Sequence, residues 1–249
     1  MPTMTVLLLG GTTEARALAE RVPVLTSLAG RTSTPLLPPG EVRIGGFGGA
    51  EGLIGYLRDT RVTAIVDATH PFAATMTAHA ATAAQATGVP LLVLRRPGWA
   101  EQPGDAWHRV GSLTSAAALL PTLAGAGSRV FLTTGRQSIG AFAGLDGHWF
   151  LSRSVEPPSP PMPARLEVIL DRGPFTADAE RALLRRHRID LLVTKDSGGS
   201  TAKLDAARAE SVPVLMVDRP PLPAGVPTAA TVAQAVDWLS NLGLVPTPA

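Results

Sequence analysis

Short apolar runs that end in glycine or hydroxyl residues recur along this chain, and they constrain its fold more than any other feature. The first run, Thr5–Leu9, passes into Gly10 and Gly11 and then into an alanine-rich segment at 12–21 with the composition of a helix. A continuous apolar strand followed at once by a helix is typical of a parallel sheet that is buried on both faces. The pattern therefore predicts an α/β protein.

The same order of strand and helix repeats along the chain. Further strands are expected at 24–28, 42–44, 64–68, 91–94, 130–133, 166–170, 190–194 and 214–217, and helices at 53–58, 72–87, 177–187, 201–210 and 230–242. The pattern loosens at 95–105, which we interpret as a linker. We therefore expect two Rossmann-like domains with parallel sheets, at 1–104 and 105–249, and an interdomain cleft at the carboxyl ends of the strands.

Composition excludes several kinds of chemistry. The 249 residues include no cysteine, which rules out disulfides, iron–sulfur clusters, cysteine-ligated zinc and thiol nucleophiles. The five histidines lack metal-ligand spacing, so we expect no metal site. A net charge of +2 gives no reason to expect a nucleic-acid partner. No stretch approaches the roughly 20 apolar residues of a membrane span, so we expect no membrane contact and a cytoplasmic location.

The turn after the first strand has the composition of a phosphate-binding turn. Two glycines and two hydroxyl residues occupy it, namely Gly10, Gly11, Thr12 and Thr13. Backbone N–H groups at a strand-to-helix turn favour a phosphate, although the standard dinucleotide pattern would have more glycines here. The alternative is an ordinary tight turn capped by Thr12.

The end of the second strand lacks the acidic residue that would hold the ribose of NAD. Ser27, Gly30 and Arg31 stand there instead, and a hydroxyl with a cation suits a ribose 2′-phosphate. These residues favour NADPH as the cofactor. The alternative is a solvated arginine after a glycine turn.

Three later strand ends carry polar residues. His70 follows the fourth strand and is either a ligand or proton carrier, or a helix-entry residue. In the second half, Thr134, Gly135 and Arg136 follow one strand. Another strand leads into Lys195, Asp196, Ser197 and Gly198, where the lysine either binds an anion or belongs to a local ion pair. We expect these groups to face one cleft.

Several familiar enzyme classes do not fit the sequence. Tyr56 is the only tyrosine and is followed by Thr60 where a short-chain dehydrogenase would have lysine. The chain also lacks the phosphate loop of NTPases and the nucleophile elbow of common hydrolases.

Taken together, the motifs resemble those of the precorrin-6A reductase family of cobalamin biosynthesis. They extend along almost the whole chain: GGTTEAR at 10–16, SLAGR at 27–31, GGFGG at 45–49, DATHPFA at 67–73, TTGR at 133–136 and KDSGG at 195–199. The resemblance implies NADPH-dependent reduction of precorrin-6A to precorrin-6B by hydride transfer to the tetrapyrrole. A hand-over to neighbouring cobalamin-pathway enzymes is compatible with that role.

The resemblance also implies roles for the residues already singled out. The cofactor phosphates would lie over Gly10–Thr13 and the 2′-phosphate near Ser27–Arg31. The substrate carboxylates need cations, for which Arg16, Arg136 and Lys195 are candidates, while Thr134, Gly135, Asp196, Ser197 and Gly198 complete the expected substrate site. His70 and Lys195 are the candidate proton donors. Two other interpretations stay open, a GT-B-like glycosyltransferase and a non-catalytic NADP-binding sensor.

Overall fold

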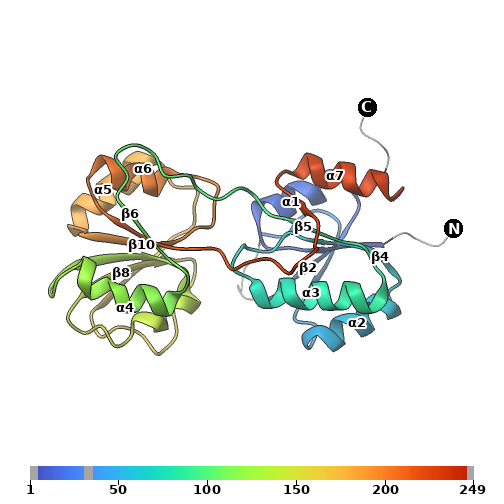
Figure 1. Ribbon diagram of the computed structural model, residues 1–249, viewed down its shortest axis with the longest axis horizontal. Helices are drawn as coiled ribbons and strands as arrows, with labels where there is room; N and C mark the ends of the chain where they lie inside the picture. The colour runs from blue at the N-terminus through green and yellow to red at the C-terminus, as the bar shows by residue number, and fades with distance from the viewer. Residues whose placement is uncertain (1–4, 31–35, 246–249) are drawn as a thin grey trace. The chain divides into compact units, whose positions relative to one another are not determined.

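The computed structural model describes residues 5–30 and 36–245. It contains two six-stranded sheets, and every strand pair in these ranges is parallel. The chain divides into two compact units: unit 1 comprises Met1–Pro97 and Pro220–Ala249, and unit 2 comprises Gly98–Arg219 (Figure 1). No helix within the described ranges has the length and apolar character needed to cross a membrane.

The sheet of unit 1 has the strand order β3-β2-β1-β4-β5-β12. Its elements are β1 (Thr5–Leu9), α1 (Thr13–Ala19), β2 (Leu25–Leu28), β3 (Glu41–Ile44), α2 (Gly49–Asp59), β4 (Val62–Asp67), α3 (Ala74–Thr87), β5 (Leu91–Leu94), β12 (Thr228–Ala229) and α7 (Val232–Asn241). Alternate residues of β1 face opposite sides, so Leu7 packs with α2 and α3 whereas Leu8 packs with α1 and α7. This is a doubly wound fold with two separate cores.

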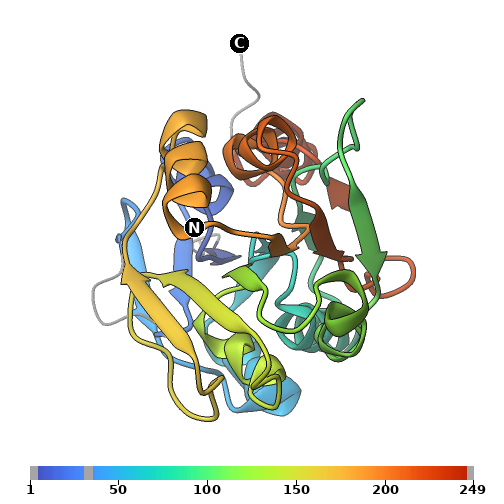
Figure 2. The same cartoon turned by 90° about the vertical axis from the view of Figure 1, so that its left-hand side faces the viewer.

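The sheet of unit 2 has the order β9-β8-β7-β10-β11-β6. Its elements are β6 (Trp107–Val110), α4 (Leu113–Leu123), β7 (Arg129–Thr133), the 3-10 helix η1 (Arg136–Phe142), β8 (Trp149–Ser154), β9 (Leu166–Leu170), α5 (Ala177–His187), β10 (Leu191–Lys195), α6 (Ala202–Ala209) and β11 (Val214–Val217). α5 and α6 lie on one side of these strands and α4 on the other (Figure 1 and Figure 2). Phe131 and Leu192 pack with Leu184 of α5 and Leu204 of α6.

The sixth strand of each sheet follows the fifth strand of the other sheet along the chain. After β5 of unit 1 the chain enters unit 2 and forms β6, and after β11 of unit 2 it returns to unit 1 and forms β12. The structure therefore divides the chain differently from the expected ranges 1–104 and 105–249. The reason is that β12 hydrogen-bonds to β5, with Arg95 N donating to Ala229 O at 2.8 Å. In addition, Leu239 of α7 shares a core with Leu18 of α1.

Candidate functional site

The turn after β1 is tied to two neighbouring strand ends in unit 1. Gly10 N donates to Ser27 O at 2.9 Å, and Thr12 Oγ1 donates to Ala68 O at 2.7 Å. Thr12 also caps α1, because its Oγ1 accepts from Ala15 N at 3.1 Å. The turn thus lies fixed between β2 and β4, where the strand order changes direction and where ligands bind in open α/β sheets.

The two glycines of this turn are needed for different reasons. A Cβ on Gly10 would lie 2.9 Å from Thr26 Cγ2, so close packing against β2 excludes a side chain. Gly11 has φ +116° and no atom within 4 Å of the place where its Cβ would lie. It therefore adopts a backbone conformation that L side chains rarely adopt, beside open space through which a ligand can approach. Thr13, the first residue of α1, is exposed.

The side chain at the end of β2 is hydrogen-bonded to Arg43, a cation that was not predicted as a site residue. Ser27 is only 6% exposed, and its Oγ accepts from Arg43 Nη1 at 2.7 Å. Gly30 has φ +68°, while the expected Arg31 lies outside the described residues. The partner of Ser27 therefore comes from β3. In the sequence, only the position of Arg43 just before the glycine-rich segment at 45–49 could have pointed to it.

The loop after β4 is organised by a buried carboxylate. Asp67 is 1% exposed and accepts from Thr69 N at 3.0 Å, Thr69 Oγ1 at 2.7 Å and Thr77 Oγ1 at 2.6 Å. His70 is exposed, and its Nδ1 accepts from Phe72 N at 3.2 Å. A ring that accepts at Nδ1 carries its proton on Nε2 when neutral. Asp67 thus shapes the loop, and the geometry is compatible with both interpretations of His70.

Arg16 lies in α1 with part of its guanidinium group buried. Its Nε is buried without a hydrogen-bond partner, and the group has no carboxylate within 4.0 Å among the residues that the structure describes. The nearby Glu14 instead pairs with Arg96, whose Nη1 lies 2.9 Å from Glu14 Oε2. A buried donor without a partner is costly, so Arg16 remains suited to an anionic ligand.

A second polar cluster lies at the carboxyl ends of β7 and β10 in unit 2. Lys195 Nζ donates to Ser138 Oγ at 2.6 Å, and burial lowers the pKa of Lys195 from 10.5 to about 8. Thr134 is 4% exposed, and its Oγ1 is buried without a hydrogen-bond partner. Gly135 has φ +87° and is the N-cap of η1, which carries Ser138. The cluster offers a weakly basic amine and hydroxyl groups at the strand ends.

Arg136 begins η1 and already has an acidic partner. Its Nη2 lies 3.0 Å from Glu156 Oε2, with both side chains partly exposed. A substrate carboxylate at Arg136 would therefore share the guanidinium group with Glu156. This ion pair was not anticipated from the sequence.

Asp196 holds together segments of unit 2 that are distant in sequence. Its Oδ1 accepts from Trp99 N at 3.0 Å, and its Oδ2 accepts from Arg109 Nη2 at 3.0 Å. Arg219 Nε donates to the Asp196 backbone carbonyl at 2.6 Å. These bonds use both carboxylate oxygens and fix the segments by which the chain enters and leaves unit 2. They favour a positioning role for Asp196 over direct contact with substrate.

The two residues after Asp196 form a tight turn. Ser197 N donates to Lys195 O at 2.7 Å, and Gly198 follows with φ +66°. The turn keeps Lys195 at the strand end. Within the described ranges, no group of three or more histidine, aspartate or glutamate side chains could hold a metal ion.

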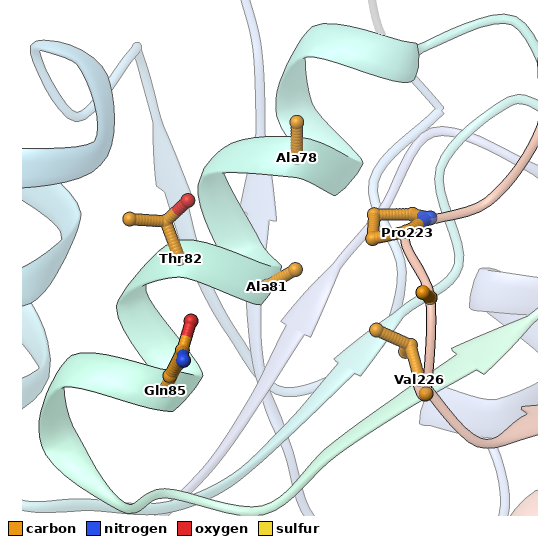
Figure 3. A pocket seen from close by; sticks show the side chains of 8 residues that line it. Ala78, Ala81, Thr82, Gln85, Pro223 and Val226 are labelled. Atoms are coloured by element: carbon orange, nitrogen blue, oxygen red, sulfur yellow. The ribbon is translucent and has the colours of Figure 1, made fainter.

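A separate pocket in unit 1 lies between α3 and the segment before β12 (Figure 3). Its lining consists of small apolar and neutral polar residues: Ala78, Ala81, Thr82, Gln85, Pro223, Ala224, Gly225 and Val226. Without a charged group it cannot neutralise the phosphates or carboxylates expected of the ligands. The candidate ligand-binding groups are therefore the turns at the strand ends of each unit.

Comparison with known proteins gives consistent matches along the chain. Residues 5–240 match the model of the precorrin-6x reductase CbiJ/CobK family. The precorrin-6A reductase of Rhodococcus erythropolis is 54% identical over 245 residues, which is 95% of this chain and 98% of that protein. The Mycobacterium tuberculosis enzyme is 52% identical with the same coverage. A solved structure of CobK precorrin-6A reductase is similar with a TM-score of 0.91, at 42% identity over 98% of both chains.

Proposed function

Because the chain belongs to the precorrin-6x reductase family, we propose that it reduces precorrin-6A to precorrin-6B with NADPH as the reductant. The observation that carries this proposal is the match over nearly the full length to precorrin-6A reductases, since both units are included. The strand order of unit 1 supports the choice of a dinucleotide, because β3-β2-β1-β4-β5 is the order of dinucleotide-binding sheets.

The residues of the first turn fit the phosphates of a dinucleotide. Gly11 leaves its backbone accessible, and Gly10 lets the turn pack close to β2. Thr12 holds the turn against β4, and Thr13 presents an exposed hydroxyl. NADPH, when bound, supplies the hydride for the reduction. The turn itself provides binding and orientation.

Reduction of a carbon–carbon double bond consumes one hydride and one proton, and we assign the proton to Lys195. With a pKa of about 8, its ammonium group is protonated at neutral pH and still acidic enough to donate. Ser138 orients the group through the 2.6 Å hydrogen bond. His70 is the second candidate, because Nε2 of its neutral ring is a donor.

Two arginines are proposed to hold the acidic side chains of the macrocycle. Arg16 has a buried Nε without a partner, and Arg136 has a partly exposed guanidinium group. A charge-assisted hydrogen bond contributes about 1.5–3 kcal/mol. The other proposed contacts come from the strand ends of unit 2, namely Thr134, Gly135, Ser197 and Gly198.

The direct test is the absorbance of NADPH at 340 nm when the protein is mixed with precorrin-6A. We expect the absorbance to fall only when both protein and tetrapyrrole are present. A glycosyltransferase would leave NADPH unoxidised and consume a sugar nucleotide instead. An NADP-binding sensor would bind NADPH by calorimetry without turnover, so the two measurements together separate the three functions.

A further inference from the structure

Arg43 occupies a fixed position at the carboxyl ends of β2 and β3. It lies directly opposite Ser27 in the register of these strands. Its Nη1 donates to Ser27 Oγ at 2.7 Å and to Gly45 O at 3.0 Å, and its Nη2 donates to Gly46 O at 3.1 Å. Three hydrogen bonds from one guanidinium group hold it in a single orientation.

Two aromatic rings support the same guanidinium group. Its central carbon lies 3.9 Å from the ring centroid of Phe47 and 5.0 Å from that of Tyr56. The two rings contact each other edge to face at 5.1 Å between their centroids. A cation over aromatic faces is stabilised without being neutralised. The group is therefore rigid before any ligand binds.

The charge of Arg43 has no acidic counterpart in the part of the chain that is described. None of the ion pairs there includes it, whereas Arg96 and Arg136 each pair with a glutamate. The three hydrogen bonds go to neutral oxygens, and Nε–H and one Nη2–H remain available. Arg43 therefore presents an uncompensated positive charge and further donors at the edge of the sheet.

In dinucleotide-binding sheets, the residues at this position discriminate between NAD and NADP. The end of the second strand lies beside the adenosine ribose, where an acidic residue selects NAD and an arginine accommodates the 2′-phosphate of NADP. Here Ser27 occupies that strand end and is bonded to Arg43. We propose that Arg43, positioned by Ser27 and the Gly45 and Gly46 carbonyls, is the residue that selects NADPH over NADH by binding its 2′-phosphate. This inference rests on the proposed function.

The test measures binding of cofactor fragments by calorimetry, without turnover. Adenosine 2′,5′-bisphosphate and adenosine 5′-monophosphate differ only in the 2′-phosphate. We expect the unaltered protein to bind the bisphosphate about ten- to a hundredfold more tightly, as one charge-assisted contact to phosphate implies. Arg43→Gln should reduce this ratio to within about threefold and leave the affinity for the monophosphate nearly unchanged. Raising the salt concentration should lower the ratio in the unaltered protein and leave it unchanged in Arg43→Gln.

Two further variants make the result specific. Arg58→Gln removes an exposed arginine from α2 in the same unit and should keep the full ratio. Ser27→Ala removes one of the three bonds that orient Arg43 and should lower the ratio at least threefold. If Arg43→Gln does not fold, as judged by thermal unfolding, the Ser27→Ala ratio decides the matter, and an unchanged ratio overturns the inference.

The outcomes separate this inference from the proposed function. If the unaltered protein binds both fragments equally, the choice of NADPH itself is wrong. If it prefers the bisphosphate and Arg43→Gln keeps that preference, NADPH stands and Arg43 is a structural residue. A loss of preference in Arg43→Gln but not in Arg58→Gln supports the assignment.

Discussion

The ammonium group of Lys195 titrates where enzyme assays are practical, because burial lowers its pKa from 10.5 to about 8. If this group donates the proton of the reduction, the rate of the chemical step follows its protonated fraction. For a pKa near 8 that fraction is about 90% at pH 7 and about 10% at pH 9. We therefore expect the single-turnover rate constant to fall roughly tenfold between these two pH values.

Variants at the same site test whether the titrating group is this lysine. Lys195→Met should lower the rate constant about 10²- to 10⁴-fold, the usual contribution of a positioned general acid, and remove the fall above pH 8. Ser138→Ala removes the acceptor at 2.6 Å that favours the charged amine. A hydrogen bond to a charged group contributes about 1.5 kcal/mol, which corresponds to about one unit of pKa. The alkaline fall in rate should then begin nearer pH 7.

Stopped-flow absorbance at 340 nm with saturating NADPH and precorrin-6A provides the measurement. Lys203→Met removes the only other lysine and is the matched control, with no expected change in the pH profile. A rate constant that is flat between pH 7 and pH 9, or an unchanged profile in Lys195→Met, would refute the assignment. A structural role of Ser138 would instead lower the rate equally at all pH values.

The same pKa has a consequence for stability. Between pH 8 and 10.5 the unfolded chain keeps the proton on Lys195 and the folded chain loses it, so this group makes the free energy of unfolding rise with pH. The difference between the two pKa values corresponds to about 3 kcal/mol at most. We expect the rise to be smaller by that amount in Lys195→Met, measured by urea unfolding at both ends of the range.

Other substitutions test the remaining parts of the proposed site and the division of the chain. Gly11→Val places a branched side chain at φ +116° and should abolish NADPH binding by calorimetry while the circular dichroism spectrum is unchanged; retained affinity would contradict the phosphate turn. Arg16→Ala and Arg136→Ala should each lower kcat/KM for the tetrapyrrole roughly ten- to a hundredfold, with a smaller loss of NADPH affinity. Wild-type turnover in both would make these arginines structural. Deleting residues 220–249 should remove hydrogen-exchange protection from unit 1 and not from unit 2; the reverse would contradict the exchange of β12.

Most of the strands that the sequence predicts to the residue are buried, continuous apolar runs. β1, β5 and β11 are of this kind, whereas β9 is also predicted to the residue although Glu167 and Leu170 are exposed. β8 was not anticipated, because its apolar residues give way to Arg153, whose largely buried side chain pairs with Glu180 of α5 and lies over the ring of Phe175. β6 contains two exposed polar residues, and β12 is two residues long. These strands depend on tertiary contacts that a local pattern does not contain.

Prediction of the candidate site residues was limited in the same way, because local patterns do not contain tertiary contacts. The first turn could be predicted because its glycines and threonines are adjacent in the sequence. The hydrogen bonds of Asp196 could not be predicted, because its carboxylate partners Trp99 and Arg109 are 97 and 87 residues away. Arg43 was not anticipated because the hydrogen bond that fixes its position goes to Ser27, 16 residues earlier in the chain. Partners at such separations leave no periodic signal.

The two units share a strand order but differ at equivalent positions. In each sheet a first strand, β1 or β7, lies beside a fourth strand, β4 or β10, and the turn after the first strand reaches the same edge. In unit 1 this turn places Gly11 in open space and leads into an α-helix, which suits a phosphate. In unit 2 it leads into a 3-10 helix that brings Ser138 to Lys195, the proton donor that we propose. The strand order thus supplies the same platform in both units, and short turn sequences decide which chemistry each platform supports.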